Sequence, residues 1–122
     1  MADSGLVISA YQGVTVVNFR DSSIIDGVVL EAINRELTPL IEQQARRKII
    51  LDFSEVRFLS SSMIGMLVNL HKKSLTIKGK IVICGLRDDL MKVFKMARLD
   101  KILTFAGDET EAMKRLDVFT GA

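Results

Sequence analysis

Hydrophobic and polar positions change period several times along the chain, which predicts strands and helices in alternation. Two short β-rich runs flank Tyr11-Gln-Gly13, and such an arrangement favours a hairpin at the edge of a sheet. Later apolar runs with polar ends are typical of interior strands in a mixed or parallel sheet. The expected strands are 6–10, 14–19, 48–52, 80–84 and 101–105.

Helical spacing of apolar residues predicts four helices between these strands. The first has Ser23 or Asp26 as a possible N-cap, and we expect Pro39 to kink it or to divide it in two. The third spans 87–97, and the last spans 108–116 and starts at Asp108 or Thr110. The residues that fall at mostly helical spacing in the first helix are Ile25, Val28, Val29, Ala32, Ile33, Glu36, Leu37 and Leu40.

The resulting order is ββαβαβαβα, which predicts an α/β fold. We expect a mixed sheet of about five strands with the N-terminal hairpin at its edge, and about four helices joined to it by right-handed crossovers. The 122 residues suffice for one core, so the chain is interpreted as a single domain, 1–122.

Composition argues against several classes of function. The 17 basic residues are nearly balanced by 15 acidic ones, so we expect no nucleic-acid partner. No apolar run approaches the roughly 18 residues that cross a bilayer, and the first residues lack a secretory pattern, so we expect a cytoplasmic protein without membrane insertion. The single cysteine, Cys84, is expected to be a small buried hydrophobe.

The most informative segment is 49–65, which reads as a buried strand, a short loop and three serines that open a helix. A helix N-terminus leaves backbone N–H groups without partners and carries partial positive charge. A phosphoserine there is compatible with the fold and adds about −1.5 to −2 charge to the surface. This pattern indicates a switch, although the serines also fit a purely structural role as helix caps.

The helix after the serines has two apolar stripes. We expect one stripe to face the core, and the second to be either covered by neighbouring helices or left open for a partner. Methionine in the second stripe suits an adaptable contact surface. The first stripe contains Ile64, Leu67, Val68, His71 and Leu75, and the second contains Met63, Met66 and Leu70.

No pattern in the chain indicates catalysis. The serines lack a G-x-S-x-G elbow, and His71 is the only histidine, so neither a base for them nor a metal site is expected. The scattered glycines form no phosphate-binding loop, which argues against nucleotide binding. We therefore expect neither an enzyme nor a protein that carries a cofactor.

The order of elements and the serine segment together resemble the STAS family, named for sulfate transporters and anti-sigma-factor antagonists. The resemblance is carried by Ile-Leu-Asp-Phe-Ser-Glu-Val-Arg-Phe-Leu-Ser-Ser-Ser-Met-Ile-Gly at 50–65, and it extends to 78–86 and 94–99. Bacterial antagonists of this family have the pattern Asp-hydrophobic-Ser-x-Val-x-Phe-hydrophobic-Asp-Ser-Ser/Thr-Gly-hydrophobic-Gly. The Ser of the Asp-Ser pair is their phosphoacceptor.

Carried over residue by residue, this resemblance implies that Ser61 is the phosphoacceptor, Asp52 the strand-end carboxylate and Gly65 the small residue early in the helix. Two positions depart from the pattern. Ser60 replaces the usual acid, and Met63 replaces the usual glycine. The loss of the acid leaves Ser60 and Ser62 as alternative acceptors.

The resemblance also implies a function. It predicts an anti-sigma factor antagonist that binds an anti-sigma serine kinase, loses that partner on phosphorylation and is restored by a PP2C-type phosphatase. The alternative is an unphosphorylated STAS subunit or scaffold of a transport or signalling complex. The expected partner contacts are Ser60, Ser61, Ser62, Met63 and Met66.

Overall fold

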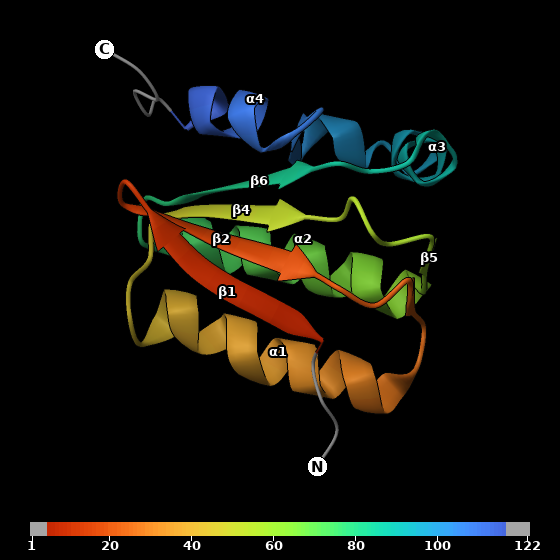
Figure 1. Cartoon of the computed structure of the whole chain (residues 1–122), viewed down its shortest axis with the longest axis horizontal. Coiled ribbons are helices and arrows are strands. Elements are labelled where there is room, and N and C mark those ends of the chain that lie inside the picture. The colour runs from red at the N-terminus through yellow and green to blue at the C-terminus, as the bar shows by residue number, and fades with distance from the viewer. Residues whose placement is uncertain (1–4, 117–122) are drawn as a thin grey trace.

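A mixed five-stranded sheet runs through the computed structural model, which describes residues 5–116 (Figure 1). The strands lie in the order β1-β2-β4-β6-β7, with β1 antiparallel to β2 and all other neighbours parallel. This confirms the expected α/β class and the hairpin at the edge. The elements are β1 (Leu6–Tyr11), β2 (Val14–Phe19), β3 (Ser23–Ile24), α1 (Gly27–Glu42), β4 (Lys48–Asp52), β5 (Phe58–Leu59), α2 (Ser61–Thr76), β6 (Lys80–Cys84), α3 (Asp88–Met96), the 3-10 turn η1 (Leu99–Lys101), β7 (Thr104–Ala106) and α4 (Glu109–Arg115).

The hairpin closes through a two-residue turn. Gln12 and Gly13 have φ angles of 50° and 80°, and Tyr11 pairs with Val14. Positive φ at both central positions is the type I′ geometry, whose twist matches that of the flanking strands. A glycine at the second position adopts it without steric cost, which explains why the chain reverses here.

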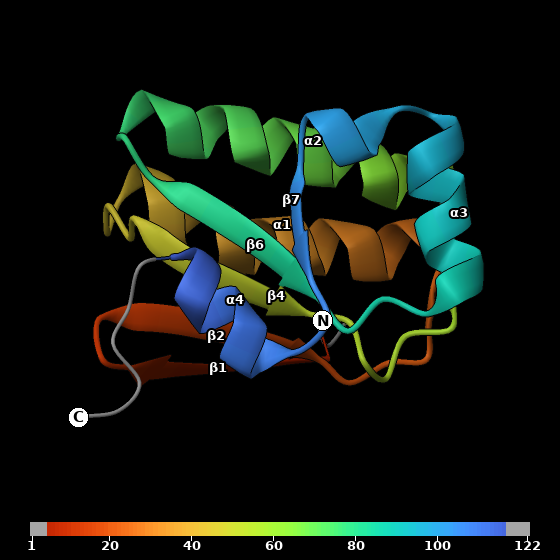
Figure 2. The same cartoon turned by 90° about the horizontal axis from the view of Figure 1, so that it is seen from above.

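Helices cover the two faces of the sheet unequally. Helices α1 and α2 lie on one face, and α4 lies on the other (Figures 1 and 2). Successive strand residues alternate between these faces. Val17 and Leu51 belong to the core under α1 and α2, whereas Val16 and Ile50 belong to a smaller core under α4.

The smaller core also contains Cys84, which is fully buried, and burial raises the pKa of its thiol to about 12. The prediction that Cys84 is buried is confirmed.

Helix α1 begins at one of the two predicted caps but does not divide at Pro39. Pro39 lies within an unbroken helix, so the prediction of a division is wrong; it stands in the last turn, where the loss of one N–H does not end the helix. Asp26 is the N-cap and accepts a 2.7 Å hydrogen bond from the Val28 N–H. Ile25 fits the helical spacing of this segment but lies before the helix, and Ile25 and Val28 are 62% and 60% exposed.

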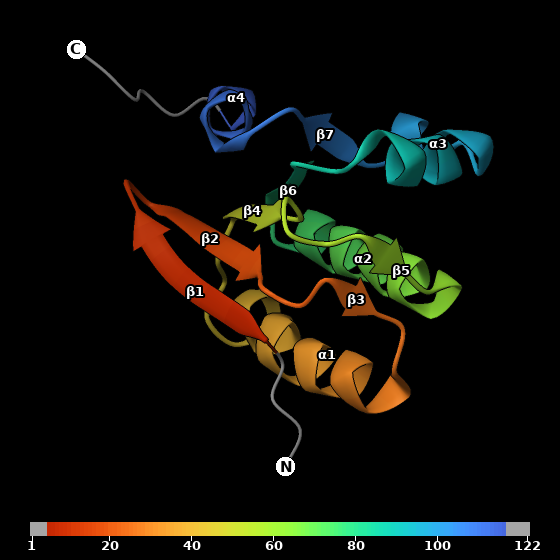
Figure 3. The same ribbon diagram turned by 45° about the vertical axis from the view of Figure 1, so that its right-hand side comes forward.

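A two-stranded parallel ribbon, which the sequence did not predict, leads into α2. Ser23 pairs with Phe58 and Ile24 with Leu59, so β3 and β5 lie side by side beyond the main sheet (Figure 3). The Ser60 N–H then donates a 3.0 Å hydrogen bond to the Ile24 carbonyl. These backbone bonds hold the residue before α2 in place.

The C-terminal elements are shorter than predicted. Strand β7 is Thr104–Ala106 because Leu99–Lys101 forms a 3-10 turn where we expected the strand to begin. Asp108 caps α4 by accepting a 2.8 Å hydrogen bond from the Glu111 N–H, which confirms one of the two predicted starts. Across residues 5–116, no helix is both long enough and apolar enough to span a bilayer.

Candidate functional site

Ser60 is the N-cap of α2. Its backbone is extended, with φ −82° and ψ 159°, and its Oγ accepts a 3.1 Å hydrogen bond from the Met63 N–H. Serine and aspartate cap helices about equally well. Replacement of the family's usual acid by Ser60 therefore removes a charge but keeps the cap.

Ser61 and Ser62 form the first turn of α2, and both are exposed. Within residues 5–116 neither hydroxyl has a hydrogen-bond partner. Ser61 lies on the same helix face as the exposed Gly65 and Asn69, because residues four apart stack along a helix. Ser61 therefore opens the solvent face of α2, at the end whose partial positive charge suits a phosphate.

Gly65 leaves bare backbone on this solvent face. A Cβ built at Gly65 meets no atom within 4 Å, so packing inside the chain does not require glycine here. Glycine nevertheless destabilises a helix interior by roughly 0.5–1 kcal/mol relative to alanine. A site that tolerates this cost without an internal reason is compatible with close approach by another molecule.

The buried face of α2 combines residues of both predicted apolar stripes, which agrees with the alternative that neighbouring elements cover the second stripe. It contains Met63, Leu67, Leu70 and Ser74, whereas Leu75 is 57% exposed. Met63 is 0% exposed, so the prediction that its side chain contacts a partner is wrong. Met66 and His71 are half-buried. Apolar residues extend around most of the helix, and its packing between α1 and the sheet decides which of them are buried.

Three exposed apolar side chains lie in β5, directly after β3 and in the first turn of α1. Phe58, in β5, is 62% exposed and lies two residues before the cap. Ile25 follows the residue that binds the Ser60 N–H, and Val28 is in the first turn of α1. We call Ile25, Val28, Phe58, Ser61, Ser62 and Gly65 the serine face. Sequence periodicity did not reveal that Ile25 and Val28 are exposed, because both fit the helical spacing of the first helix.

An open hollow of about 620 Å³, lined in part by arginine, borders the serine face through Phe58. It lies where β2 and β4 end, and Arg20 in it forms a 2.8 Å ion pair with Glu55. Arg57 has no ion-pair partner within the described residues. The lining residues are Arg20, Ser22, Ser54, Glu55, Arg57, Phe58 and Arg87.

Asp52 is joined to α4 rather than to the serines. It is 8% exposed, accepts a 2.9 Å hydrogen bond from the Ser54 N–H and forms a side-chain hydrogen bond with Glu109. Burial alone would raise the pKa of Asp52, but these hydrogen bonds outweigh it and lower the pKa. The hydrogen bond to Asp52, burial and the Asp52 charge together raise the pKa of Glu109 to about 7. Below about pH 7, Glu109 therefore tends to keep its proton, whereas the lowered pKa of Asp52 favours its ionised form.

The sheet order, the edge hairpin and the capped serine run define a mixed α/β domain of the STAS type. Residues 6–112 match the family model of the STAS domain, and the chain belongs to this family.

Anti-sigma factor antagonists are among the proteins that resemble this chain in sequence or in structure. The anti-sigma F factor antagonist of Paenibacillus polymyxa is 22% identical over 108 residues, which are 88% of this chain and 91% of that protein. An anti-sigma-factor antagonist (STAS) domain protein from Planctomyces limnophilus superposes with a TM-score of 0.81 at 20% identity, over 94% of this chain and 99% of that one. The phosphorylated form of SpoIIAA from Bacillus superposes with a TM-score of 0.70 at 22% identity, over 90% of this chain and 97% of that one. At such identities the similarity establishes the fold.

Proposed function

We propose that this chain is an anti-sigma factor antagonist, a non-enzymatic regulatory domain of the cytoplasm. It binds an anti-sigma serine kinase through the serine face, and phosphorylation of Ser61 releases that partner. The observation that carries the proposal is the exposed Ser61 hydroxyl beside a cap made by Ser60. Membership of the STAS family and the antagonists among its relatives support it. A PP2C-type phosphatase restores the unmodified form.

The choice among the three serines follows from their surroundings. Ser60 is half-buried, and its oxygen already accepts the Met63 N–H, so modification there competes with the cap. Ser61 and Ser62 are both exposed, but Ser61 also occupies the position that matches the family's acceptor. Ser62 is therefore the second candidate, and Ser60 the third.

Release of the partner follows from desolvation and charge. Phosphate on Ser61 adds about −1.5 to −2 charge three residues after the exposed Phe58, and burying that charge in a partly apolar interface is costly. The neighbouring arginine-lined hollow favours acidic groups on the partner, which would then repel the phosphate. Both effects weaken the bound state while the domain stays folded.

The direct test is incubation with the cognate kinase and ATP, followed by mapping of phosphate by mass spectrometry. We expect one phosphate at Ser61, lost in Ser61→Ala and retained in Ser60→Ala and Ser62→Ala. A second substrate of the same kinase verifies that the enzyme is active. Absence of phosphate from residues 60–62 under those conditions would overturn the switch.

A second candidate function is a constitutive subunit or scaffold of a transport or signalling complex. It is favoured by Ser60, which serves as a cap without the acidic charge usual beside the acceptor, and by Met63, which serves as a core residue. Affinity purification of the wild type and Ser61→Asp distinguishes the two candidates. The same partners recovered with both proteins would support the scaffold, whereas loss of a kinase from Ser61→Asp supports the switch.

A further inference from the structure

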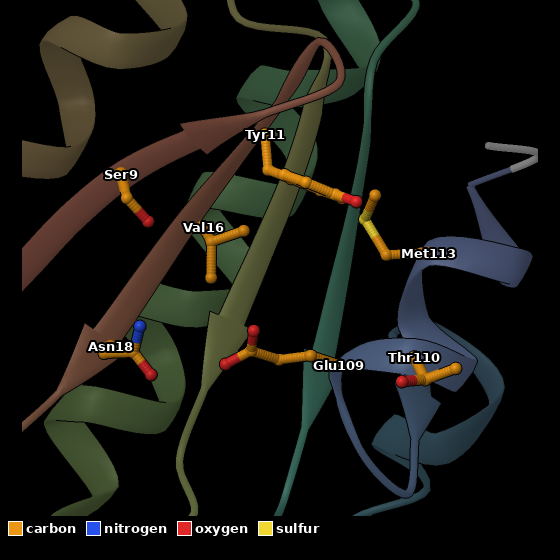
Figure 4. A pocket seen from close by; sticks show the side chains of 7 residues that line it. All are labelled: Ser9, Tyr11, Val16, Asn18, Glu109, Thr110 and Met113. Atoms are coloured by element: carbon orange, nitrogen blue, oxygen red, sulfur yellow. The ribbon is translucent and has the colours of Figure 1, made fainter. Parts of the chain in front are cut away.

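A hollow of about 420 Å³ is lined by residues of the edge hairpin and α4. Figure 4 shows these side chains from close by. Helix α4 lies on the sheet face opposite α1 and α2 (Figure 1). Its size falls within the range of small-molecule sites. Figure 4 shows Glu109 pointing from α4 toward β2, and Tyr11 extending from β1 toward Met113. The lining residues are Ser9, Tyr11, Val16, Asn18, Glu109, Thr110 and Met113.

The formal charge that this lining can carry at neutral pH has one sign, because its only group that ionises there is the carboxyl of Glu109. Its amide and three hydroxyls can each donate or accept hydrogen bonds, so they can also serve as acceptors for a cation. Val16 and Met113 add apolar surface, and no lysine, arginine or histidine of the described chain lines the hollow. The exposed ring of Tyr11, an edge-strand residue, adds an aromatic surface that attracts cations.

We propose that this hollow binds a small organic ammonium ion. The ammonium group donates hydrogen bonds to the Glu109 carboxylate and the Asn18 amide oxygen, the ring of Tyr11 contacts the charge, and the alkyl part packs on Val16 and Met113. This site belongs to the sheet face opposite α2, so it is independent of the serine face.

The acid pair formed by Asp52 and Glu109 makes binding of such a ligand depend on the protonation of Glu109. The titratable groups that face Glu109 are Asp52 of β4, Cys84 of β6 and Asp108 beside it, and none of them supplies positive charge. An ammonium ion would favour the ionised form of Glu109 and so expel its proton. We therefore expect tighter binding at about pH 8 than at about pH 6, on either side of the Glu109 pKa of about 7.

The test uses n-butylammonium chloride as the probe, titrated into ¹⁵N-labelled full-length protein at constant ionic strength. We expect saturable shifts of the amide signals of Asn18, Glu109 and Thr110. Neutral n-butanol and anionic butyrate are the matched probes, and neither is expected to produce saturable shifts. No saturable shift with butylammonium, or equal shifts with butanol, would overturn the proposal.

Three single-residue variants test which side chains bind butylammonium. Glu109→Gln keeps a hydrogen bond to Asp52 but removes the charge, and it should weaken butylammonium binding about tenfold or more. Tyr11→Ala, at the exposed hairpin, should weaken it severalfold, and it remains informative even if Glu109→Gln disturbs α4. Glu31→Gln removes a charge from the exposed surface of α1 and should bind like the wild type. Equal affinity in all four proteins would contradict the site.

Discussion

The Met63 N–H donates a 3.1 Å hydrogen bond to Ser60 Oγ, and this bond separates the roles of the serines at the start of α2. It leaves Ser60 as the structural cap and places Ser61 one residue inside the helix with its hydroxyl in solvent. The buried Met63 side chain anchors the same turn in the core. A modification at Ser61 can therefore change the surface without removing the cap.

Loss of the cap should reduce stability. Ser60→Ala removes the acceptor for the Met63 N–H, and we expect the free energy of unfolding to fall by about 1 kcal/mol. Ser60→Asp keeps a capping oxygen, so its free energy of unfolding should fall by much less than that of Ser60→Ala. Urea denaturation of both variants checks this, and equal losses would show that the cap contributes little.

A charge at position 61 should separate stability from binding. Ser61→Asp puts a negative charge in the first turn of α2, where the helix dipole favours it by about 0.3–1 kcal/mol. We expect unchanged or slightly higher stability in urea, together with a loss of kinase affinity of about tenfold or more in calorimetry. Ser61→Ala should bind like the wild type. Equal affinities of both variants would defeat the switch.

Phe58 should contribute to binding and little to folding. Its side chain is 62% exposed, so Phe58→Ala should change the free energy of unfolding by less than about 1 kcal/mol. An exposed aromatic residue at the centre of an interface typically contributes more than about 1 kcal/mol to binding. We therefore expect Phe58→Ala to lose that much binding free energy for the kinase. Leu75→Ala, equally exposed at the other end of α2, is the control and should bind normally.

Gly65→Ala should stabilise the domain but weaken its partner complex. A Cβ at Gly65 meets nothing inside the chain, and alanine favours the helix by roughly 0.5–1 kcal/mol. The added methyl group lies on the solvent face near Ser61, where we expect the partner to approach the backbone. If Gly65→Ala is more stable but binds the kinase as tightly as the wild type, the kinase does not contact the backbone at Gly65.

The acid pair predicts how stability depends on pH. The pKa of Glu109 is raised from 4.5 to about 7, so its contribution is fully present below pH 4.5 and is lost as the pH rises through about 7. The pKa of Asp52 is lowered, so its contribution is present above pH 3.8 and is lost as the pH falls below that value.

Urea denaturation at a series of pH values tests this dependence. We expect the free energy of unfolding of the wild type to decline between pH 4.5 and about 7. Glu109→Gln keeps an uncharged donor to Asp52 at every pH and should flatten that decline. Parallel curves for the two proteins would show that the pair does not control stability.

Local patterns were sufficient to predict most of the architecture. The hairpin follows from the Gln12-Gly13 turn, and the interior strands 48–52 and 80–84 follow from continuous apolar runs. The Asp108 cap was likewise visible as a polar residue before a helical pattern. These features depend on residues within a few positions of each other, so the sequence by itself determines them.

Other features depend on distant parts of the chain. Periodicity left two apolar faces on α2, and only packing against α1 and the sheet buried Met63 and exposed Leu75. The β3 and β5 ribbon likewise turned Ile25 toward solvent. Asp52 and Glu109 are 57 positions apart, and only the crossover that places α4 over β4 allows them to form a hydrogen bond. Burial and electrostatics arise from neighbours in space, so the tertiary structure alone decided them.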